Sequence, residues 1–255
     1  NIANDPAVEL KPELSWEVNV LSSMKIIEFC IKNKVKKFFF ASSGSVYGIK
    51  KEKKVTENLS LEPISVYNKT KMIAERIFLS YKKKIKLYIV RPATVCGVST
   101  RQRLDVSVNA LTISALKNNI INVFGGQQIR PNIHIDDMVN VYDHLFFKNC
   151  PSGIYNAGFE NYSIKKIANS VAKITKAKIK IKKTNDPRSY RIDSSKLLNT
   201  GFKPNKNIFN AIFEIKKKYE RNKKFFDKKN AYTVLWMKQK KIIWTVTIFQ
   251  KKYEK

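Results

Sequence analysis

The sequence of 255 residues is poor in cysteine and has no long apolar run. Its three cysteines, Cys30, Cys96 and Cys150, are odd in number and form no CxxC pair. That usage does not fit a disulfide framework and is typical of reduced thiols in the cytosol. The longest late apolar run, residues 242–249, is far too short to cross a bilayer. We therefore expect a soluble, cytoplasmic protein without a membrane partner.

Arginine is also scarce, although the formal net charge is +30. Only 8 of the 50 basic residues are arginine, and the 42 lysines are spread along the whole chain. A charge of this size can indicate nucleic acid or an anionic membrane as a partner. Arginine, however, is the better residue for contacts to base edges and phosphates. Because lysine, isoleucine and asparagine share A/T-rich codons, the composition favours codon bias over a specific nucleic-acid partner.

Hydrophobic residues make up 43% of the chain, which is typical of a globular protein. Apolar periodicity predicts helices at 14–33, 65–82, 106–118, 134–147 and 163–175, and strands at 35–43, 85–92, 121–124, 153–158 and 177–183. Asp136 or Asp137 is a candidate N-cap. This alternation predicts βαβ units with a mostly parallel sheet. Residues 222–255 are rich in lysine and aromatic residues without a clear period, and we expect a poorly ordered extension there.

A tyrosine four residues before a lysine on a helix places both side chains on one face. The ammonium would lower the pKa of the phenol, which could then act as a general acid or base. Tyr67 is the favoured candidate because it opens an amphipathic helix 24 residues after Ser43, which ends a buried strand. Open α/β sheets form their sites at such carboxyl ends. Four pairs have this spacing: Tyr47/Lys51, Tyr67/Lys71, Tyr162/Lys166 and Tyr219/Lys223.

Four segments in a fixed order carry a family resemblance: ASSGSVYG (41–48), SVYNKTKMIAE (65–75), IVRPATVCG (89–97) and VFGGQQIRPNIHIDDM (123–138). Together they resemble the extended short-chain dehydrogenase/reductases, and more narrowly the NAD-dependent epimerase/dehydratase group that acts on nucleotide sugars. The resemblance implies an α/β fold, with a Rossmann-type parallel sheet and a smaller, mostly C-terminal substrate-binding part. It divides the chain into a partial NAD-binding core (1–97 and 130–158), a substrate-binding part (98–129 and 159–221) and a basic tail of unknown role (222–255).

The resemblance also implies roles for individual residues. Tyr67 would be the catalytic base, Lys71 its partner and a ribose ligand, and Ser43 would hydrogen-bond the reacting sugar hydroxyl. The remaining cofactor residues would be Pro92, Asn19 and Ser42. The nucleotide sugar would be held by Ser45, Thr94, Asn109, Arg130 and Arg188.

Simpler roles remain open for several of these residues. Ser43 could be only a turn hydroxyl, Asn109 a helix-surface amide, and Arg130 and Arg188 surface charges. We interpret His134 as structural and identify no metal site.

The sequence departs from the family pattern at two places. None of its eight glycines forms the GxxGxxG turn that cradles the cofactor pyrophosphate. We therefore expect that at least two strand–helix units of the Rossmann sheet are absent, and that the chain is a fragment or truncated product that binds NAD poorly and exposes an apolar sheet edge. Gly44 and Ser45 stand where sugar dehydratases carry an Asp-Glu pair, and Ser45 also stands where sugar-acid decarboxylases carry a glutamate.

These departures favour simple hydride chemistry at one carbon. The leading hypothesis is a homodimeric nucleotide-sugar epimerase acting at C4 through transient oxidation by bound NAD. A keto-sugar reductase using NAD or NADP is the first alternative. A non-catalytic truncated remnant with a basic, anion-binding surface is the second. The sugar, the nucleotide and the choice of NAD or NADP stay open.

Overall fold

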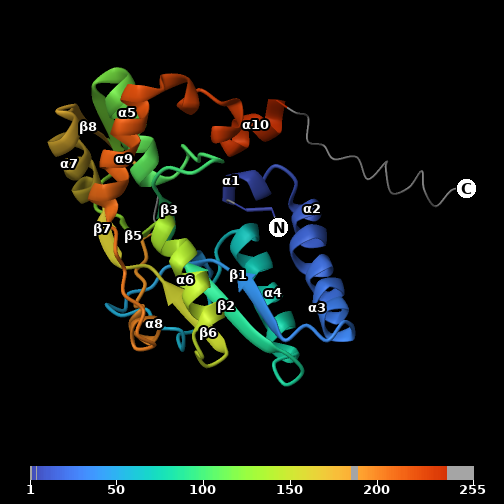
Figure 1. Cartoon of the computed structure of the whole chain (residues 1–255). Coiled ribbons are helices and arrows are strands. Elements are labelled where there is room, and N and C mark those ends of the chain that lie inside the picture. Colours follow the sequence, from blue (N-terminus) through green and yellow to red (C-terminus); the bar gives the residue numbers. More distant parts are fainter. Residues whose placement is uncertain (1, 4, 185–188, 240–255) are drawn as a thin grey trace, which may run out of the picture.

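The computed structural model describes residues 2–3, 5–184 and 189–239 (Figure 1). Strands and helices alternate along these residues. The helices are α1 (Asp5–Val8), α2 (Pro12–Trp16), α3 (Ser22–Lys32), α4 (Val66–Ser80), α5 (Ser107–Asn118), α6 (Ile135–Phe147), α7 (Ile164–Thr175), α8 (Ser195–Leu198), α9 (Ile208–Arg221) and α10 (Thr233–Gln239). The strands are β1 (Lys37–Ala41), β2 (Lys86–Pro92), β3 (Thr94–Cys96), β4 (Ile120–Phe124), β5 (Ile129–His134), β6 (Gly153–Ala157), β7 (Glu160–Ser163) and β8 (Lys178–Lys182).

The main sheet is parallel, with the strand order β1-β2-β6. Alternate residues of its strands face two apolar clusters, because successive side chains point to opposite faces. Phe40 and Ile89 pack with α3 and α4 on one face, and Val90 and Tyr155 pack with α6 and α8 on the other. Figure 1 shows these helices on the two sides of the sheet. The predicted α/β fold, with a parallel sheet covered on both faces, is confirmed.

A second group of elements contains α5, α7 and α9, which pack with β4 and β8. Its buried residues include Leu111, Ile121, Val171 and Ile212, which come from both predicted substrate-binding segments. A further small sheet, in the order β3-β5-β7, pairs β3 with β5 in parallel and β5 with β7 antiparallel. The exact domain boundaries stay a prediction.

The prediction of a poorly ordered tail is wrong for residues 222–239. Phe226 is fully buried in a cluster with Leu104, Ile113 and Ile215, and the N–H of Leu104 donates to the carbonyl of Ala231 at 2.8 Å. The chain then continues into α10, which packs against α1. Aromatic residues without helical period can still fill a core when short 3₁₀ turns, here Lys223–Phe226 and Lys229–Ala231, present them. Residues 240–255 lie outside the described part.

Several other predictions need correction. The single helix predicted at 14–33 contains a π-helical segment, Glu17–Leu21, between α2 and α3. Neither Asp136 nor Asp137 caps α6, because the cap is His134, whose side chain accepts from the Asp136 N–H. Asp137 instead accepts from the backbone N–H groups of Asn205 and Lys206. The sequence reading also missed β3, β5, β7 and α9.

Three features of the described residues bear on the remaining expectations. In the described part of the chain β1 is the edge strand of its sheet, and Phe38 and Phe39 on it are half-buried. Cys30, Cys96 and Cys150 are all unpaired thiols. Among the described residues, none of the helices has the length and apolar character needed to cross a bilayer.

Candidate active site

The carboxyl end of β1 delivers a pair of serines to the site. The N–H of Ser42 continues the pairing with β2 by donating to the carbonyl of Val90 at 2.8 Å. Ser43 then caps a short 3₁₀ turn, Gly44–Tyr47, and its Oγ accepts from the N–H of Ser45 at 3.2 Å. The strand therefore ends in two consecutive serines at the carboxyl edge of the sheet.

Helix α4 brings the predicted base to the same place. Its N-cap Ser65 accepts from the N–H of Asn68, so Tyr67 lies in the first helical turn. Lys71 lies one turn later, and its Nζ is 5.9 Å from the centre of the Tyr67 ring. This Nζ is buried and donates to the carbonyl of Ala41 at 2.7 Å. The ammonium thus lies behind the phenol ring and ties α4 to the end of β1.

Ser43 and Tyr67 both line one cavity of about 380 Å³. Its wall comes from the loop after β1, the start of α4, the start of β3, the loop before α5 and β5. Of the residues predicted for the site, those in the wall are Ser42, Ser43, Ser45, Tyr67, Pro92, Thr94 and Arg130. The fold therefore assembles side chains from four separate sequence segments around a space large enough for a small ligand.

Asn19 and Asn109, which were predicted to contact the cofactor and the substrate, form hydrogen bonds within the protein instead. The amide of Asn19 is fully buried and bonds the backbone N–H and carbonyl of Ile2 and the hydroxyl of Thr70. The amide of Asn109 bonds the backbone of Gly97 and Arg103 at 2.8 to 3.2 Å. Neither residue lines the cavity. The amide N–H groups of both donate to backbone carbonyls or to a hydroxyl of the protein itself. Asn109 instead shapes the loop that carries Arg103. Arg188 lies outside the described residues.

The expected electrostatic effect of Lys71 on Tyr67 is wrong for this structure. Burial raises the pKa of Tyr67 to about 12, and a hydrogen bond from the Ser43 side chain only partly opposes this effect. Burial lowers the pKa of Lys71 to about 8, with Glu75 opposing the shift. Desolvation is the largest cause of both shifts, so burial favours the neutral form of each group.

A buried ion pair stands directly behind the site. Arg91 on β2 donates through Nε and Nη2 to the two carboxylate oxygens of Glu75 on α4, at 3.0 and 2.6 Å. The Ser42 hydroxyl donates to the same carboxylate, and Nη1 of Arg91 donates to the Tyr47 hydroxyl at 2.8 Å. The Tyr47 hydroxyl in turn donates to Asn156 on β6. This network connects α4, the helix that carries Tyr67, with β2 and β6.

The cavity also contains residues that the sequence reading missed: Asp5, Asn68, Arg103, Asp105 and Tyr190. The Arg103 Nε pairs with Asp105 at 3.0 Å, and Asp5 accepts from the Ser65 hydroxyl. Asn68 was the easiest of these residues to predict from the sequence, because it directly follows Tyr67. The others lie in loops, where no periodicity marks the direction of a side chain.

The other tyrosine–lysine pairs lie away from the cavity wall. Tyr47 is fully buried in the network with Arg91. The Lys166 ammonium stacks on the Tyr162 ring at 3.7 Å, and Lys223 lies 5.9 Å from the Tyr219 ring. Its place in the cavity wall thus distinguishes Tyr67 from the tyrosines of the other three pairs, which have the same spacing.

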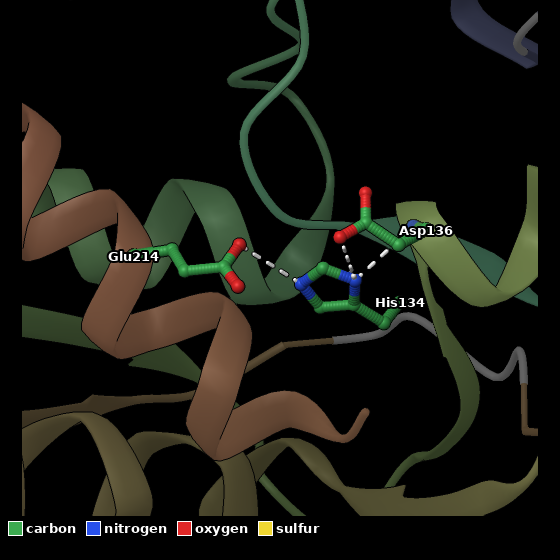
Figure 2. A group of neighbouring side chains, drawn as sticks. All are labelled: His134, Asp136 and Glu214. Carbon is green, nitrogen blue, oxygen red and sulfur yellow. Dashed lines mark hydrogen bonds and ion pairs between the residues drawn. The ribbon is translucent and has the colours of Figure 1, made fainter. Parts of the chain in front are cut away.

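His134, Asp136 and Glu214 form a cluster between α6 and α9 (Figure 2). The His134 Nδ1 accepts from the Asp136 N–H at 3.1 Å, so its proton is on Nε2, which faces Glu214 at 3.1 Å. The Lys206 ammonium bridges the Asp136 and Glu214 carboxylates at 2.6 and 2.7 Å. Because both imidazole nitrogens are used and the Lys206 ammonium pairs with both carboxylates, the cluster joins α6 to α9. The absence of a metal site stays a prediction.

Comparisons with known proteins agree with this geometry. The model of the NAD dependent epimerase/dehydratase family matches residues 2–158. A UDP-glucose 4-epimerase of Lactobacillus helveticus is 27% identical over 76% of this chain and 67% of its own length. An uncharacterized UDP-glucose epimerase of Bacillus subtilis is 38% identical over 48% of this chain, which is 38% of that protein. The chain thus spans only part of these relatives.

Solved structures are also similar to this chain over most of its length. The UDP-glucuronic acid 4-epimerase from Bacillus cereus, solved with UDP-glucuronic acid and NAD, superposes with a TM-score of 0.74 at 26% identity. The match covers 86% of this chain and 74% of that one.

Proposed function

Because the chain belongs to the NAD-dependent epimerase/dehydratase family, we propose that its cavity binds a nucleotide-diphosphate sugar and that the protein inverts this sugar at C4. The observation that carries the proposal is the meeting of the Tyr67 and Ser43 hydroxyls in one cavity. Arg103 and Arg130 line the same space, and guanidinium groups are suited to a diphosphate. UDP-sugar 4-epimerases among the relatives support this choice of substrate class.

Each hydroxyl has a distinct role in this proposal. Ser43 orients the C4 hydroxyl of the sugar beside the phenol, and Tyr67 takes the proton from that hydroxyl as a phenolate and later returns it to the keto oxygen. Because burial raises the pKa of Tyr67 to about 12 in the ligand-free chain, this role requires that bound ligands lower that pKa. Lys71, behind the ring, ties the helix to the end of β1 and offers its ammonium to a ribose hydroxyl. A bound NAD would supply reversible hydride transfer at C4.

The residues present fit one half of an NAD site. Tyr67, Ser42 and Pro92 gather at the carboxyl ends of β1 and β2, where the nicotinamide and its ribose would lie. The pyrophosphate needs a glycine-rich turn, and this sequence has no GxxGxxG. We therefore expect weak NAD binding by this chain. NADP remains an open alternative.

The loop after β1 favours inversion over elimination. Gly44 and Ser45 carry no carboxylate, and a side chain at position 44 would meet Ile192 and the Pro92 carbonyl. Among the described residues of the cavity wall, the carboxylates are Asp5 and Asp105, which come from other segments and bond Ser65 and Arg103. A keto-sugar reductase would use the same hydroxyls and would release its oxidised cofactor.

We also propose a homodimer, since α3 exposes apolar side chains on its outer face. Met24 and Phe29 there have exposed fractions of 43% and 66%. Light scattering after gel filtration tests this state directly, and a monomer at all concentrations would contradict it.

Calorimetric titrations of the chain with UDP-glucose, with NAD and with duplex DNA at two salt concentrations test the proposed function. We expect one-to-one binding of UDP-glucose. Strongly salt-dependent DNA binding, without affinity for UDP-glucose or NAD, would instead indicate a non-catalytic basic remnant.

A further inference from the structure

The loop between β3 and α5, residues 97–106, supplies a charged pair to the cavity wall. Arg103 and Asp105 both line the cavity, and the Arg103 Nε lies 3.0 Å from the Asp105 carboxylate. Leu104 stands between them, is only 2% exposed and belongs to the apolar cluster that contains Phe226. Three consecutive residues of one loop therefore connect the cavity with the apolar cluster behind it.

The C-terminal segment, residues 222–239, holds this loop from the side of the cluster. Phe226 is fully buried there. The N–H of Leu104 donates to the carbonyl of Ala231 at 2.8 Å. The Asp227 carboxylate pairs with the Lys117 ammonium of α5 at 2.5 Å. Apolar packing, a backbone hydrogen bond and an ion pair thus fix the segment to the loop and to the helix that follows it.

The same segment also reaches a second wall of the cavity. Its last helix, α10, packs against α1 (Figure 1), and Asp5 and Pro6 of α1 line the cavity. A loop without regular structure depends on tertiary contacts for its conformation, and a helix of four residues has little stability of its own. Two walls of the cavity therefore owe part of their order to residues 222–239.

We propose that the C-terminal segment positions the cavity walls for the nucleotide-diphosphate sugar, with Phe226 as the positioning residue that fixes the Arg103 loop through Leu104. The inference rests on the proposed function for the identity of the ligand. The described residues of the cavity wall include none from 222–239, so the segment acts through Arg103. A guanidinium that is already held in place loses less conformational freedom when it binds a diphosphate.

Calorimetric titration with UDP tests this coupling in the full chain. Arg103→Ala should weaken UDP binding about 10-fold or more, because a hydrogen bond to a charged group is lost. Phe226→Ala should weaken it several-fold, although Phe226 does not line the cavity. In the Arg103→Ala background, Phe226→Ala should have little further effect, since no guanidinium is left to position.

Two variants separate positioning from a general loss of stability. Phe78→Ala makes the same truncation at a residue that is 2% exposed in the cluster of the main sheet, and UDP affinity should stay within about twofold of the wild-type value. Phe226→Leu keeps an apolar side chain in the cluster and should retain most of the affinity. It also provides a folded variant if Phe226→Ala does not fold.

A protease that cleaves after arginine examines the loop without any ligand. Arg101 is exposed and Arg103 lies two residues further along the same loop. Cleavage after these two residues should be faster in Phe226→Ala than in Phe78→Ala or the wild-type chain, because the loop opens locally more often. Mass spectrometry of the fragments identifies the two sites.

The inference is overturned if Phe226→Ala binds UDP as tightly as the wild-type chain, or if Phe78→Ala weakens binding equally. It is also overturned if the effects of Arg103→Ala and Phe226→Ala simply multiply in the double variant. Failure of the proposed function would appear separately, as absence of UDP binding by the wild-type chain. The protease assay would then decide alone whether residues 222–239 hold the loop, and equal cleavage in all variants would exclude it.

Discussion

Removing the Glu75 carboxylate should strongly destabilise the protein. Glu75 and Arg91 have side chains that are only 1% and 3% exposed, and they share two hydrogen bonds. Glu75→Ala leaves a guanidinium buried without its counter-charge. Breaking a buried pair in this way costs about 3–5 kcal/mol, since the remaining charge keeps its desolvation penalty. The cost exceeds that of a cavity of the same size because Ser42 also loses its acceptor.

An exposed ion pair supplies the control. Lys216 and Glu220 lie one turn apart on α9 at 2.6 Å, and the Glu220 side chain is 56% exposed. Glu220→Ala should cost only about 0.3–0.5 kcal/mol, because solvent screens the pair. The Glu75→Leu, Arg91→Met double variant should recover most of the loss, as it removes both charges together.

Urea unfolding followed by circular dichroism measures these differences. With a slope of about 2–3 kcal/mol per molar urea, Glu75→Ala should lower the midpoint by about 1–2 M. A midpoint within the range of the Glu220→Ala control would refute the reasoning. So would a double variant that is less stable than Glu75→Ala.

Three further predictions concern the site and its surroundings. Tyr67→Phe should reduce epimerisation about 10²–10⁴-fold while the affinity for UDP-glucose is kept. The control is Tyr219→Phe, which should have no effect although its ring lies equally far from its lysine. Equal losses in both variants would contradict the role of Tyr67. Because the pKa of Tyr67 is raised to about 12 in the folded state, its contribution to stability is complete below pH 10 and is lost as pH rises toward 12. The unfolding free energy of Tyr67→Phe should therefore fall less over that range, and parallel pH curves would count against the shift. EDTA should leave the melting temperature unchanged, since Lys206 already bridges the carboxylates beside His134; a clear drop would indicate a bound metal.

The sequence predicted the main sheet well because its strands are short apolar runs that end at turn residues. Residues 38–40 and 87–90 are uninterrupted apolar runs, and no polar alternation obscures them. It missed β5 and β7 because Arg130, Asn132 and Asn161 interrupt their apolar pattern. It also missed the packing of Phe226, since contacts with Leu104 and Ile215 come from segments distant in sequence.

For the site, the sequence located Tyr67, Ser43 and Lys71 because one strand end and one helix start fix their positions. It misjudged the direction of the Tyr67 pKa shift, because burial depends on the whole fold and here is the largest cause of that shift. It placed Asn109 in the site although backbone partners use its amide. Side chains of loops, such as Arg103, could not be placed without the tertiary structure.

The most direct test of the central claim follows the sugar itself. The chain is incubated with UDP-glucose and NAD, and the product is identified by proton NMR, beside Tyr67→Phe under the same conditions. The account predicts UDP-galactose, changed at C4 alone, from the wild-type chain and none from the variant. A 4-keto-6-deoxy sugar, or the same yield of UDP-galactose from Tyr67→Phe, would contradict it.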